Sequence, residues 1–599
     1  MKQFWKMVLA VICGIILTSV VTTILLSSIL SGIAAIGSSQ TTLPKSGVMT
    51  IDFAKISFAE QSGSADPMSM LMAGSMGETM GLWQAVQAIN AAAEDPAVKY
   101  IYLKPDAASG GIATLEELRK SLKNFRASGK PIIAYIESPS TASYYIASVA
   151  DKIYMTKAEG ATHMFFGVGS QLIFLKDILD KLGVNVQLIR HGKYKSAGEM
   201  FVKSESSPEN LEQNQAMIDS IWESYASEIA ESRGITVEAL NEMVEDLKLN
   251  FNTDFIDCGL VDELLSREEL QSKLADLAVK DSFKDVKMFS IADYAKAKVL
   301  PNIKAHKKIA IIYANGDIVE GSAKQNVAGD RFASIIAKVR ADSTVKAVVF
   351  RVNSPGGSVL ASDKIKTEID LLRADKPVIA SYGEYAASGG YWISNSCDKI
   401  FSDATTLTGS IGVFSMIPDF SGTLKNIAHV NITTVGSSSH TDMYNLMRPL
   451  SAAETEYMQS SVEHIYETFV SIVADGRDLE PDYIDSIAQG RVWTGSDALE
   501  IGLVDEIGTL EDALNWAASA GGDSSLKDWQ IAEYPKPMSQ MQSLISLIGS
   551  SSEDEELAAF RGTAFESVAK TMFDLSKKWD GHNREGYTFA RLPYAIDIR

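Results

Sequence analysis

Short apolar runs alternate with segments of helical periodicity along residues 308–402. The runs are continuous, as expected of strands that are buried on both faces of a sheet. They fall at Lys308–Tyr313, Val345–Val352, Val378–Tyr382 and Lys399–Ser402. Helical patterns cover Arg331–Arg340 and Ser362–Leu372, and a third helix of about ten residues is expected to begin near Ser388. Strands that alternate with helices predict right-handed crossovers, a mainly parallel sheet and an α/β fold.

The same order of motifs occurs twice, at an offset of about 247 residues that shrinks slightly towards the C-terminus. Matching pairs include Val98-Lys99 with Val345-Lys346, Ser109-Gly110-Gly111 with Pro355-Gly356-Gly357, Lys130–Ala134 with Lys376–Ala380, Asp151–Ile153 with Asp398–Ile400, and Gly259–Glu263 with Gly502–Glu506. A slowly drifting offset is what loop deletions leave in a duplicated domain. We therefore divide the chain into an N-terminal anchor (1–45), a first repeat (46–300), a second repeat (301–530) and a C-terminal tail (531–599).

Length and charge agree with this division. A chain of 599 residues is too long for one core but suits two ordinary domains. The formal net charge of −21 argues against a phosphate-binding surface, because affinity for nucleic acid comes largely from Lys and Arg. Nucleic acid is therefore excluded as a partner.

The N-terminal segment has the composition of a membrane anchor. After Lys2 and Lys6, no charged residue occurs from Met7 to Pro44, and about 20 apolar residues suffice to cross a bilayer. A cleavable signal peptide is the alternative, since residues 31–37 include several small residues near the end of the apolar run. The length of the apolar run favours a retained helix, and the two lysines place the N-terminus in the cytoplasm and the rest of the chain outside.

Two strand-to-helix junctions of the second repeat carry candidate chemistry. In Asn353–Ser358, paired glycines let backbone N–H groups turn outward, where they can hold a developing oxyanion. In Tyr385–Trp392, Ser388 is flanked by small residues at the start of a helix, so its Oγ is expected to be accessible beside the next N–H. Either motif alone is more often a plain turn or an N-cap. Together they make Ser388 the candidate nucleophile.

The base that would activate Ser388 is not evident within the second repeat. The seven histidines are scattered, and no lysine occurs between Lys425 and Lys527. Lysine can serve as the base if burial or nearby cations lower its pKa. The first repeat has a basic segment, Arg190–Glu199, whose counterpart near Val435–Thr441 contains no lysine, while Thr141-Ala142-Ser143 replaces the serine motif. Each repeat has lost what the other supplies.

Four segments carry a resemblance to a known family. Asn353–Ser358, Ala387–Trp392, Thr408–Gly412 and, in the first repeat, Tyr194–Ala197 resemble bacterial signal peptide peptidase A of the long, duplicated type, within the ClpP and crotonase superfamily. The resemblance implies two tandem ClpP/crotonase-like domains and a Ser-Lys dyad in which Ser388 is the nucleophile and Lys195 the general base. It also implies that the N–H groups of Gly357 and Gly389 form the oxyanion hole, with Gly356 as the alternative to Gly357. Arg190 and Lys193 are expected to favour a neutral Lys195 if their side chains point towards it.

The resemblance further implies a serine endopeptidase without cofactor or metal, assembled as a homotetramer, that degrades remnant signal peptides or other unfolded segments. We expect it in the bacterial inner membrane with its catalytic body on the periplasmic side. The sequence leaves open whether the dyad forms within one chain or between neighbours. Two alternatives are a crotonase-like acyl-CoA enzyme, which would need acidic catalytic groups and a CoA site, and a noncatalytic membrane scaffold.

Overall fold

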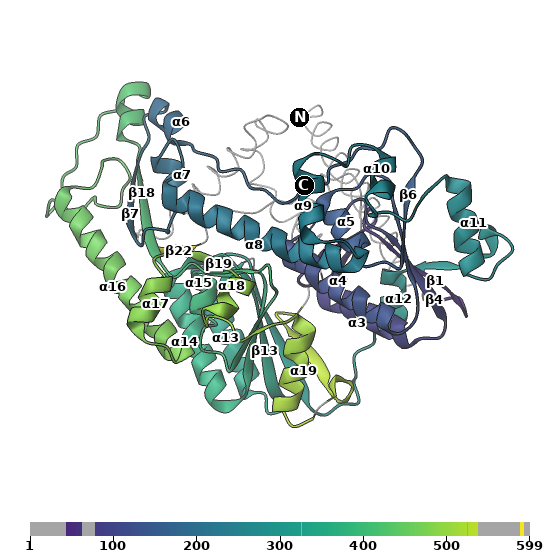
Figure 1. The fold of residues 1–599 in the computed structure, drawn as a ribbon. Helices are drawn as coiled ribbons and strands as arrows, with labels where there is room; N and C mark the ends of the chain where they lie inside the picture. The colour runs from purple at the N-terminus through teal and green to yellow at the C-terminus, as the bar shows by residue number, and fades with distance from the viewer. Residues whose placement is uncertain are drawn as a thin grey trace, which may run out of the picture.

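The computed structural model describes residues 43–62, 78–108, 110–324, 326–523, 525–536 and, as backbone, 588–591. Figure 1 shows two α/β units side by side, with the long helix α8 (Pro208–Arg233) running from one towards the other. The predicted anchor helix in residues 1–45 lies outside the described residues, apart from its last three. Within the described ranges, no helix combines the length and apolar composition needed to cross a membrane.

The first repeat is built on a parallel sheet of six strands in the order β8-β6-β5-β4-β1-β9. These strands are β1 (Gly47–Asp52), β4 (Val98–Lys104), β5 (Ile132–Ile136), β6 (Lys152–Thr156), β8 (Glu263–Leu265) and β9 (Met288–Ser290). A short parallel pair, β2 (Ile56–Ala59) and β3 (Glu78–Gly81), comes between β1 and β4 in the sequence. All five residues of β5 are buried, as a strand covered on both faces requires.

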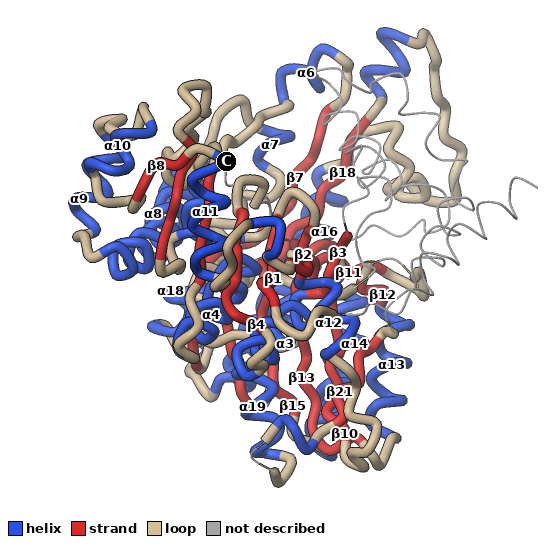
Figure 2. Tube along the Cα trace, turned by 90° about the vertical axis from the view of Figure 1, so that its right-hand side faces the viewer, coloured by secondary structure: helices blue, strands red, loops and turns tan. Residues whose placement is uncertain are grey.

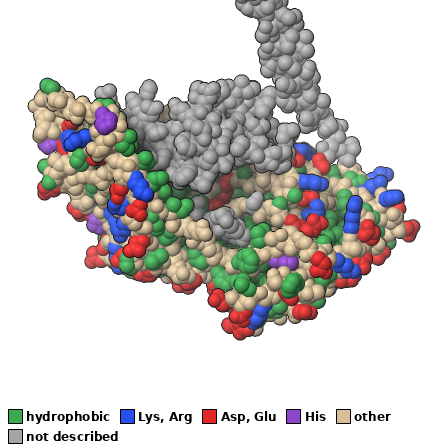
Figure 3. Space-filling model, turned by 90° about the horizontal axis from the view of Figure 1, so that it is seen from above, with side chains coloured by type: hydrophobic (Ala, Val, Ile, Leu, Met, Phe, Trp, Pro, Cys, Tyr) green, Lys and Arg blue, Asp and Glu red, His purple; other side chains and the backbone are tan. Residues whose placement is uncertain are grey.

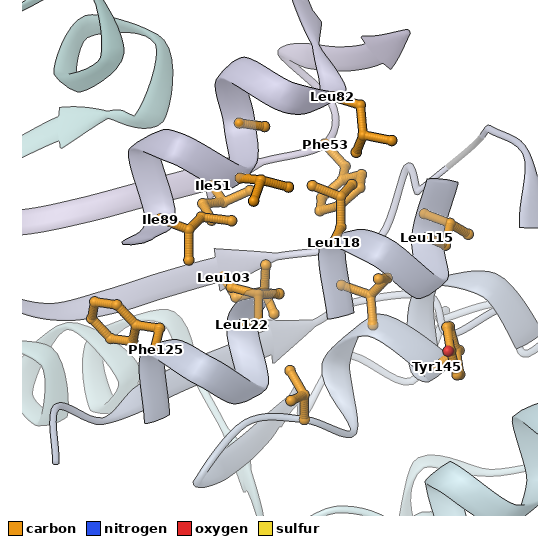
Figure 4. Packing of buried hydrophobic residues seen from close by; sticks show 14 of the residues in the cluster. Ile51, Phe53, Leu82, Ile89, Leu103, Leu115, Leu118, Leu122, Phe125 and Tyr145 are labelled. Atoms are coloured by element: carbon orange, nitrogen blue, oxygen red, sulfur yellow. The ribbon is translucent and has the colours of Figure 1, made fainter. Parts of the chain in front are cut away.

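Helices cover this sheet by burying apolar stripes. In α4 (Ile112–Ala127), Leu115, Leu118, Leu122 and Phe125 recur at helical spacing and are buried. Figure 4 shows Leu118 and Leu122 beside Phe53 and Leu103. The other helices of this repeat are α3 (Leu82–Glu94), α5 (Thr141–Ala147), α6 (Lys176–Lys181), α7 (Glu199–Val202), α8, α9 (Val237–Glu245), α10 (Asn252–Asp257), α11 (Arg267–Leu277) and α12 (Ile291–Lys298).

The second repeat contains an eight-stranded sheet whose main path is β19-β17-β15-β13-β10-β21. Its strands are β10 (Lys308–Asn315), β13 (Val345–Ser354), β15 (Val378–Ala387), β16 (Lys399–Ser402), β17 (Leu407–Gly409), β19 (Val492–Thr494), β20 (Glu506–Ile507) and β21 (Gln530–Tyr534). Every pairing is parallel except that of β17 with β19. The α/β class with mainly parallel sheets is therefore confirmed.

The helices of the second repeat follow the predicted order but not all the predicted lengths. They are α13 (Gly329–Ala341), α14 (Val359–Asp375), α15 (Gly389–Trp392), α16 (Ala452–Arg477), α17 (Pro481–Ile487), α18 (Gly495–Glu500) and α19 (Leu510–Ala520). The prediction of a helix of about ten residues from Ser388 is wrong, because α15 has four residues. The Asn395 amide donates to the carbonyls of Tyr391 and Trp392 and ends the helix there.

A third sheet joins the two repeats in the order β12-β11-β14-β22-β18-β7. Its strands are β7 (Asn185–His191), β11 (Ile318–Val319), β12 (Val327–Ala328), β14 (Gly356–Ser358), β18 (Val413–Asp419) and β22 (Thr588–Arg591). β7 of the first repeat pairs antiparallel with β18 of the second over the whole length of both, and the two strands lie side by side in Figure 2. The tail therefore returns to its own chain, because β22 pairs with β14 and β18.

The two repeats also share buried apolar surface. One cluster contains Ile89 and Phe125 of the first repeat together with Ile311, Val349 and Leu514 of the second. On the outside of the molecule, Figure 3 shows acidic side chains gathered along one rim of the described surface. Burial of a continuous apolar interface fixes the repeats against each other.

A buried arginine adds specificity to this interface. Arg351 of β13 is fully buried; its Nε lies 2.8 Å and its Nη2 3.0 Å from the carboxylate of Glu60, and Nη2 lies 2.7 Å from Glu117. Both carboxylates come from the first repeat. Because a buried charge needs a partner in good geometry, only one docking of the repeats satisfies Arg351.

Candidate active site

Ser388 lies at the junction of β15 and α15 in a strained backbone conformation. Its φ is 57° and its ψ is −114°, a combination that is unusual for a residue with a side chain. The Ser388 N–H donates to the Gly409 carbonyl at 2.8 Å, which ties the turn to β17. A Cβ at Gly390 would lie 2.5 Å from the Ser354 carbonyl oxygen, so the turn requires a glycine there. The serine is fully buried among the described residues.

Lys195 reaches this serine from the first repeat of the same chain. The antiparallel register of β7 with β18 sets His191 opposite Val413, so the chain leaving β7 passes the segment that enters β18. Lys195 Nζ lies 2.8 Å from Ser388 Oγ and 3.0 Å from both the carbonyl oxygen and the Oγ of Ser410. The structure therefore brings together the two residues that the sequence predicted as nucleophile and base.

Burial sets the protonation of Lys195. The residue is only 1% exposed, and loss of solvation holds the pKa of its amine well below the ordinary value. The expected help from neighbouring cations is wrong: Arg190 Nη1 donates to the Lys195 carbonyl and pairs with Glu199, and the Lys193 amine lies over the Tyr194 ring. Because Glu199 neutralises Arg190, the lowered pKa of Lys195 comes from desolvation and not from a neighbouring cation.

The surroundings of Lys195 include residues that the sequence did not reveal. A Cβ at Gly490, whose φ is +78°, would lie 2.5 Å from the Lys195 Cβ, so the lysine is packed against bare backbone. Gln213 of α8 donates to the Tyr194 carbonyl and to Ser196 Oγ, and it holds the lysine segment in place. Ser410 lies inside the Thr408–Gly412 motif, but the motif does not show that Ser410 contacts the lysine.

The predicted oxyanion glycines lie side by side. A Cβ on Gly389 would be 3.1 Å from the Gly357 nitrogen, so the two backbones approach closely. Gly356 donates its N–H to Ser354 Oγ at 3.2 Å, so this N–H already has an acceptor, which favours Gly357 over Gly356. Gly357 itself has no room for a side chain, because its Cβ would lie 2.0 Å from the Ile318 carbonyl oxygen. Two N–H groups beside a serine can stabilise an oxyanion.

An extended segment lies along the oxyanion strand. β22 pairs antiparallel with β14, with Gly356 opposite Arg591, Gly357 opposite Ala590 and Ser358 opposite Phe589. On its other side β22 pairs with Phe414 and Ser415 of β18. The strand that contains Gly357 thus pairs with a peptide backbone in antiparallel register.

Two α/β repeats, one with a buried serine at a strand end and the other with a lysine beside it, indicate a duplicated serine peptidase. Comparison with known proteins supports this class. The model of peptidase family S49 matches residues 124–280 and 370–522, once in each repeat. Protease 4 of Haemophilus influenzae is 34% identical over 484 residues, which cover 78% of each chain. The chloroplastic serine protease SPPA of Arabidopsis thaliana is 30% identical over 468 residues, which cover 77% of this chain and 68% of the relative.

The chain therefore belongs to peptidase family S49 and is a serine peptidase. The predicted resemblance to the long, duplicated signal peptide peptidase A type is confirmed by the two family matches and the extent of the relatives. Among solved structures, a point mutant of ClpP1 from Listeria monocytogenes matches 34% of this chain and 94% of its own at 16% identity and a TM-score of 0.24.

Proposed function

We propose that the protein is a membrane-anchored serine endopeptidase with a Ser-Lys dyad completed within one chain. Ser388 of the second repeat is the nucleophile and Lys195 of the first is the general base. The observation that supports this assignment most directly is the 2.8 Å contact between Lys195 Nζ and Ser388 Oγ at a fully buried site. A lysine kept neutral by burial can accept the serine proton.

The reaction would run in two acyl-transfer steps. The Ser388 hydroxyl attacks the peptide carbonyl while its proton passes to Lys195 Nζ, and the N–H groups of Gly357 and Gly389 stabilise the oxyanion. The lysinium then returns the proton to the leaving amine. Water enters, Lys195 accepts its proton, and the acyl-enzyme ester is hydrolysed through the same base. Ser410 orients the amine through two contacts at 3.0 Å.

Peptide substrates would bind by strand addition. β14 already pairs with an extended segment, residues 588–591, in antiparallel register. A substrate bound in the same place gains backbone hydrogen bonds that do not depend on its side chains. This mode suits unfolded segments and remnant signal peptides, the substrates that the family resemblance implies.

The location and assembly are also part of the proposal. The uncharged segment Met7–Pro44 would span the bacterial inner membrane and hold the catalytic body on the periplasmic side. The family resemblance implies a homotetramer around the active sites. Crosslinking and sedimentation of the detergent-solubilised full chain would measure the subunit number.

Fluorophosphonate labelling with mass-spectrometric mapping tests the assignment. We expect one modified serine, Ser388, with labelling abolished in Ser388→Ala and strongly slowed in Lys195→Ala. Thr141, the first-repeat counterpart of Ser388, is the matched control, and Thr141→Ala should be labelled at the wild-type rate. Modification at another serine, or none, would refute the proposed nucleophile.

A further inference from the structure

The first repeat retains the glycine turn that corresponds to the oxyanion strand, and a carboxylate binds the start of helix α4 directly after it. Glu384 of the second repeat accepts the N–H groups of Ala113 and Thr114 at 3.0 and 2.8 Å, and the Thr114 hydroxyl at 2.8 Å. The sequence aligns Gly110-Gly111 of this turn with Gly356-Gly357. The N-terminus of the helix that follows this turn thus binds a carboxylate in the first repeat.

The local sequence explains why the turn accepts Glu384. α4 begins after Gly111 without any side-chain N-cap, whereas α14 is capped by Ser358, whose Oγ accepts the Ala361 N–H. The unsatisfied N–H groups and the helix dipole at the start of α4 favour a negative group. Gly111 leaves the space, because a Cβ there would lie 1.7 Å from Glu384 Oε1. Glu384 is the cap that α4 lacks.

Glu384 belongs to a bulge directly before the nucleophile. β13 pairs Val352 with Tyr382 and Ser354 with Ala386, so three residues of β15 stand opposite one residue of β13. Such a bulge interrupts the regular ladder and redirects the strand. Within the bulge, Asn353 Oδ1 accepts the Tyr385 N–H at 3.2 Å, and on its other side Tyr385 pairs with Leu407 of β17. The conformation of this bulge determines where Ser388, four residues beyond Glu384, is placed.

We propose that Glu384 is a positioning residue for the nucleophile, whose carboxylate is held by the N-terminus of α4, directly after the glycine turn of the first repeat, and fixes the bulge of β15 that presents Ser388. The proposal rests on Ser388 as the reacting serine. It gives the first repeat a second part in the reaction, besides supplying Lys195: the start of its helix α4 holds the bulged strand of the other repeat in place.

A reciprocal contact provides a matched control. Glu116 of α4 accepts the N–H groups of Ala404 and Thr405 and the Thr405 hydroxyl at 2.9, 3.2 and 2.8 Å. It crosses the same interface in the opposite direction with the same set of donors. Its target precedes β17, whose residues Leu407–Gly409 pair in regular register with both β15 and β19. Glu116 therefore joins the repeats without acting on a bulge.

The test compares Glu384→Gln with Glu116→Gln in the full-length protein. For Glu384→Gln we expect the rate constant of fluorophosphonate labelling at Ser388 and kcat for a peptide to fall about tenfold, with KM within about twofold, because misplacement affects chemistry more than binding. For Glu116→Gln both rates should stay within about twofold of wild type. Wild-type labelling rate in Glu384→Gln, or equal losses in the two variants, would overturn the positioning role.

Two milder variants serve the same test if Glu384→Gln or Glu116→Gln does not fold. Thr114→Val and Thr405→Val each remove one hydroxyl donor, at 2.8 Å, to Glu384 and Glu116 respectively. Thr114→Val should slow labelling about threefold and Thr405→Val should not. Equal rates would refute the proposal, whereas labelling that maps away from Ser388 in the wild type would refute the proposed function instead.

Discussion

The two repeats contain the same glycine turn in two different surroundings. In the second repeat, Gly356-Gly357 lies beside Gly389, the residue after the proposed nucleophile, and its strand pairs with an extended segment. In the first repeat, Gly110-Gly111 leads into a helix whose N-terminus is occupied by Glu384. The difference shows that a helix that follows such a turn without a side-chain N-cap takes an acceptor from elsewhere in the chain, because its first N–H groups are otherwise unsatisfied.

The two serine positions show the same division. Ser388 is held at a positive φ against the lysine, whereas its counterpart Thr141 begins α5 in a regular helix and donates to the Gly167 carbonyl. Of these two counterpart positions, only that of the proposed nucleophile has a strained backbone. Such strain persists only where the surroundings over-determine it, as Gly409 and the bulge of β15 do here.

The largest expected effect comes from removing either member of the dyad. Ser388→Ala and Lys195→Ala should each lower kcat/KM for peptide hydrolysis by about 10³-fold or more, because nucleophile and base act as one unit. Lys195→Arg should fail equally, since a guanidinium stays protonated. Assays with a fluorogenic peptide and circular dichroism would separate inactivity from unfolding. Substantial activity in Lys195→Ala would remove that lysine from the mechanism.

The next effect separates the two turns. Gly357→Ala places a Cβ 2.0 Å from the Ile318 carbonyl and should cost about 10²-fold in kcat, as the loss of an oxyanion donor does. Gly111→Ala meets the end of the Glu384 side chain and should cost only about tenfold by expelling it. Steady-state kinetics measures both, and losses in the reverse order would mean that the first-repeat turn is the catalytic one.

A double mutant sharpens this comparison. If Gly111→Ala acts by displacing Glu384, then Gly111→Ala with Glu384→Gln should be no slower than either single variant, which gives a coupling of about one order of magnitude in kcat. Independent multiplication of the two losses would show that Gly111 acts through another contact. Labelling rates at Ser388 provide a second, substrate-free readout of the same cycle.

Local pattern accounts for what the sequence predicted well. Continuous apolar runs gave the buried strands β10, β13, β15 and β16, because strands buried on both faces have no polar alternation. Ser388 and Lys195 were identified through motifs, and one loss in each repeat suggested that they cooperate. Glu384, Gly490 and Gln213 could not be identified this way. Their parts depend on contacts between distant segments, which neither spacing nor periodicity encodes.

The prediction of a longer α15 failed for a similar reason. The residues after Trp392 are weak helix formers, and the Asn395 side chain donates to the carbonyls of Tyr391 and Trp392 at the end of the helix. The expected effect of Arg190 on Lys195 failed because Glu199, nine residues further on, neutralises the guanidinium. In both cases a polar side chain makes a contact that the sequence pattern does not show.

A smaller effect concerns the stability cost of the lysine that the first repeat supplies. Because burial lowers the pKa of Lys195 in the folded state, the unfolded chain binds a proton that the folded chain does not, and stability rises with pH up to the ordinary lysine pKa. Lys195→Met should therefore raise the free energy of unfolding at pH 7 by about 1–3 kcal/mol, and by less at pH 9. Lys193→Met, at an exposed position, should change little. Denaturant titrations at both pH values measure this, and a gain that grows with pH would contradict it.

The smallest effect tests strand addition beside the second-repeat turn. β22 lies between β14 and β18, and proline is excluded from a central strand because it lacks the N–H that the ladder needs. Ala590→Pro should release the segment opposite Gly357, so that a larger fraction of molecules is open to peptide. An occupant that competes within the chain raises KM and leaves kcat unchanged, so the variant should lower KM about threefold at constant kcat. Ala559→Pro, in the same tail outside β22, is the matched control and should keep the wild-type KM. A change in kcat without a change in KM would mean that residues 588–591 support the oxyanion strand and do not occupy the place of a substrate.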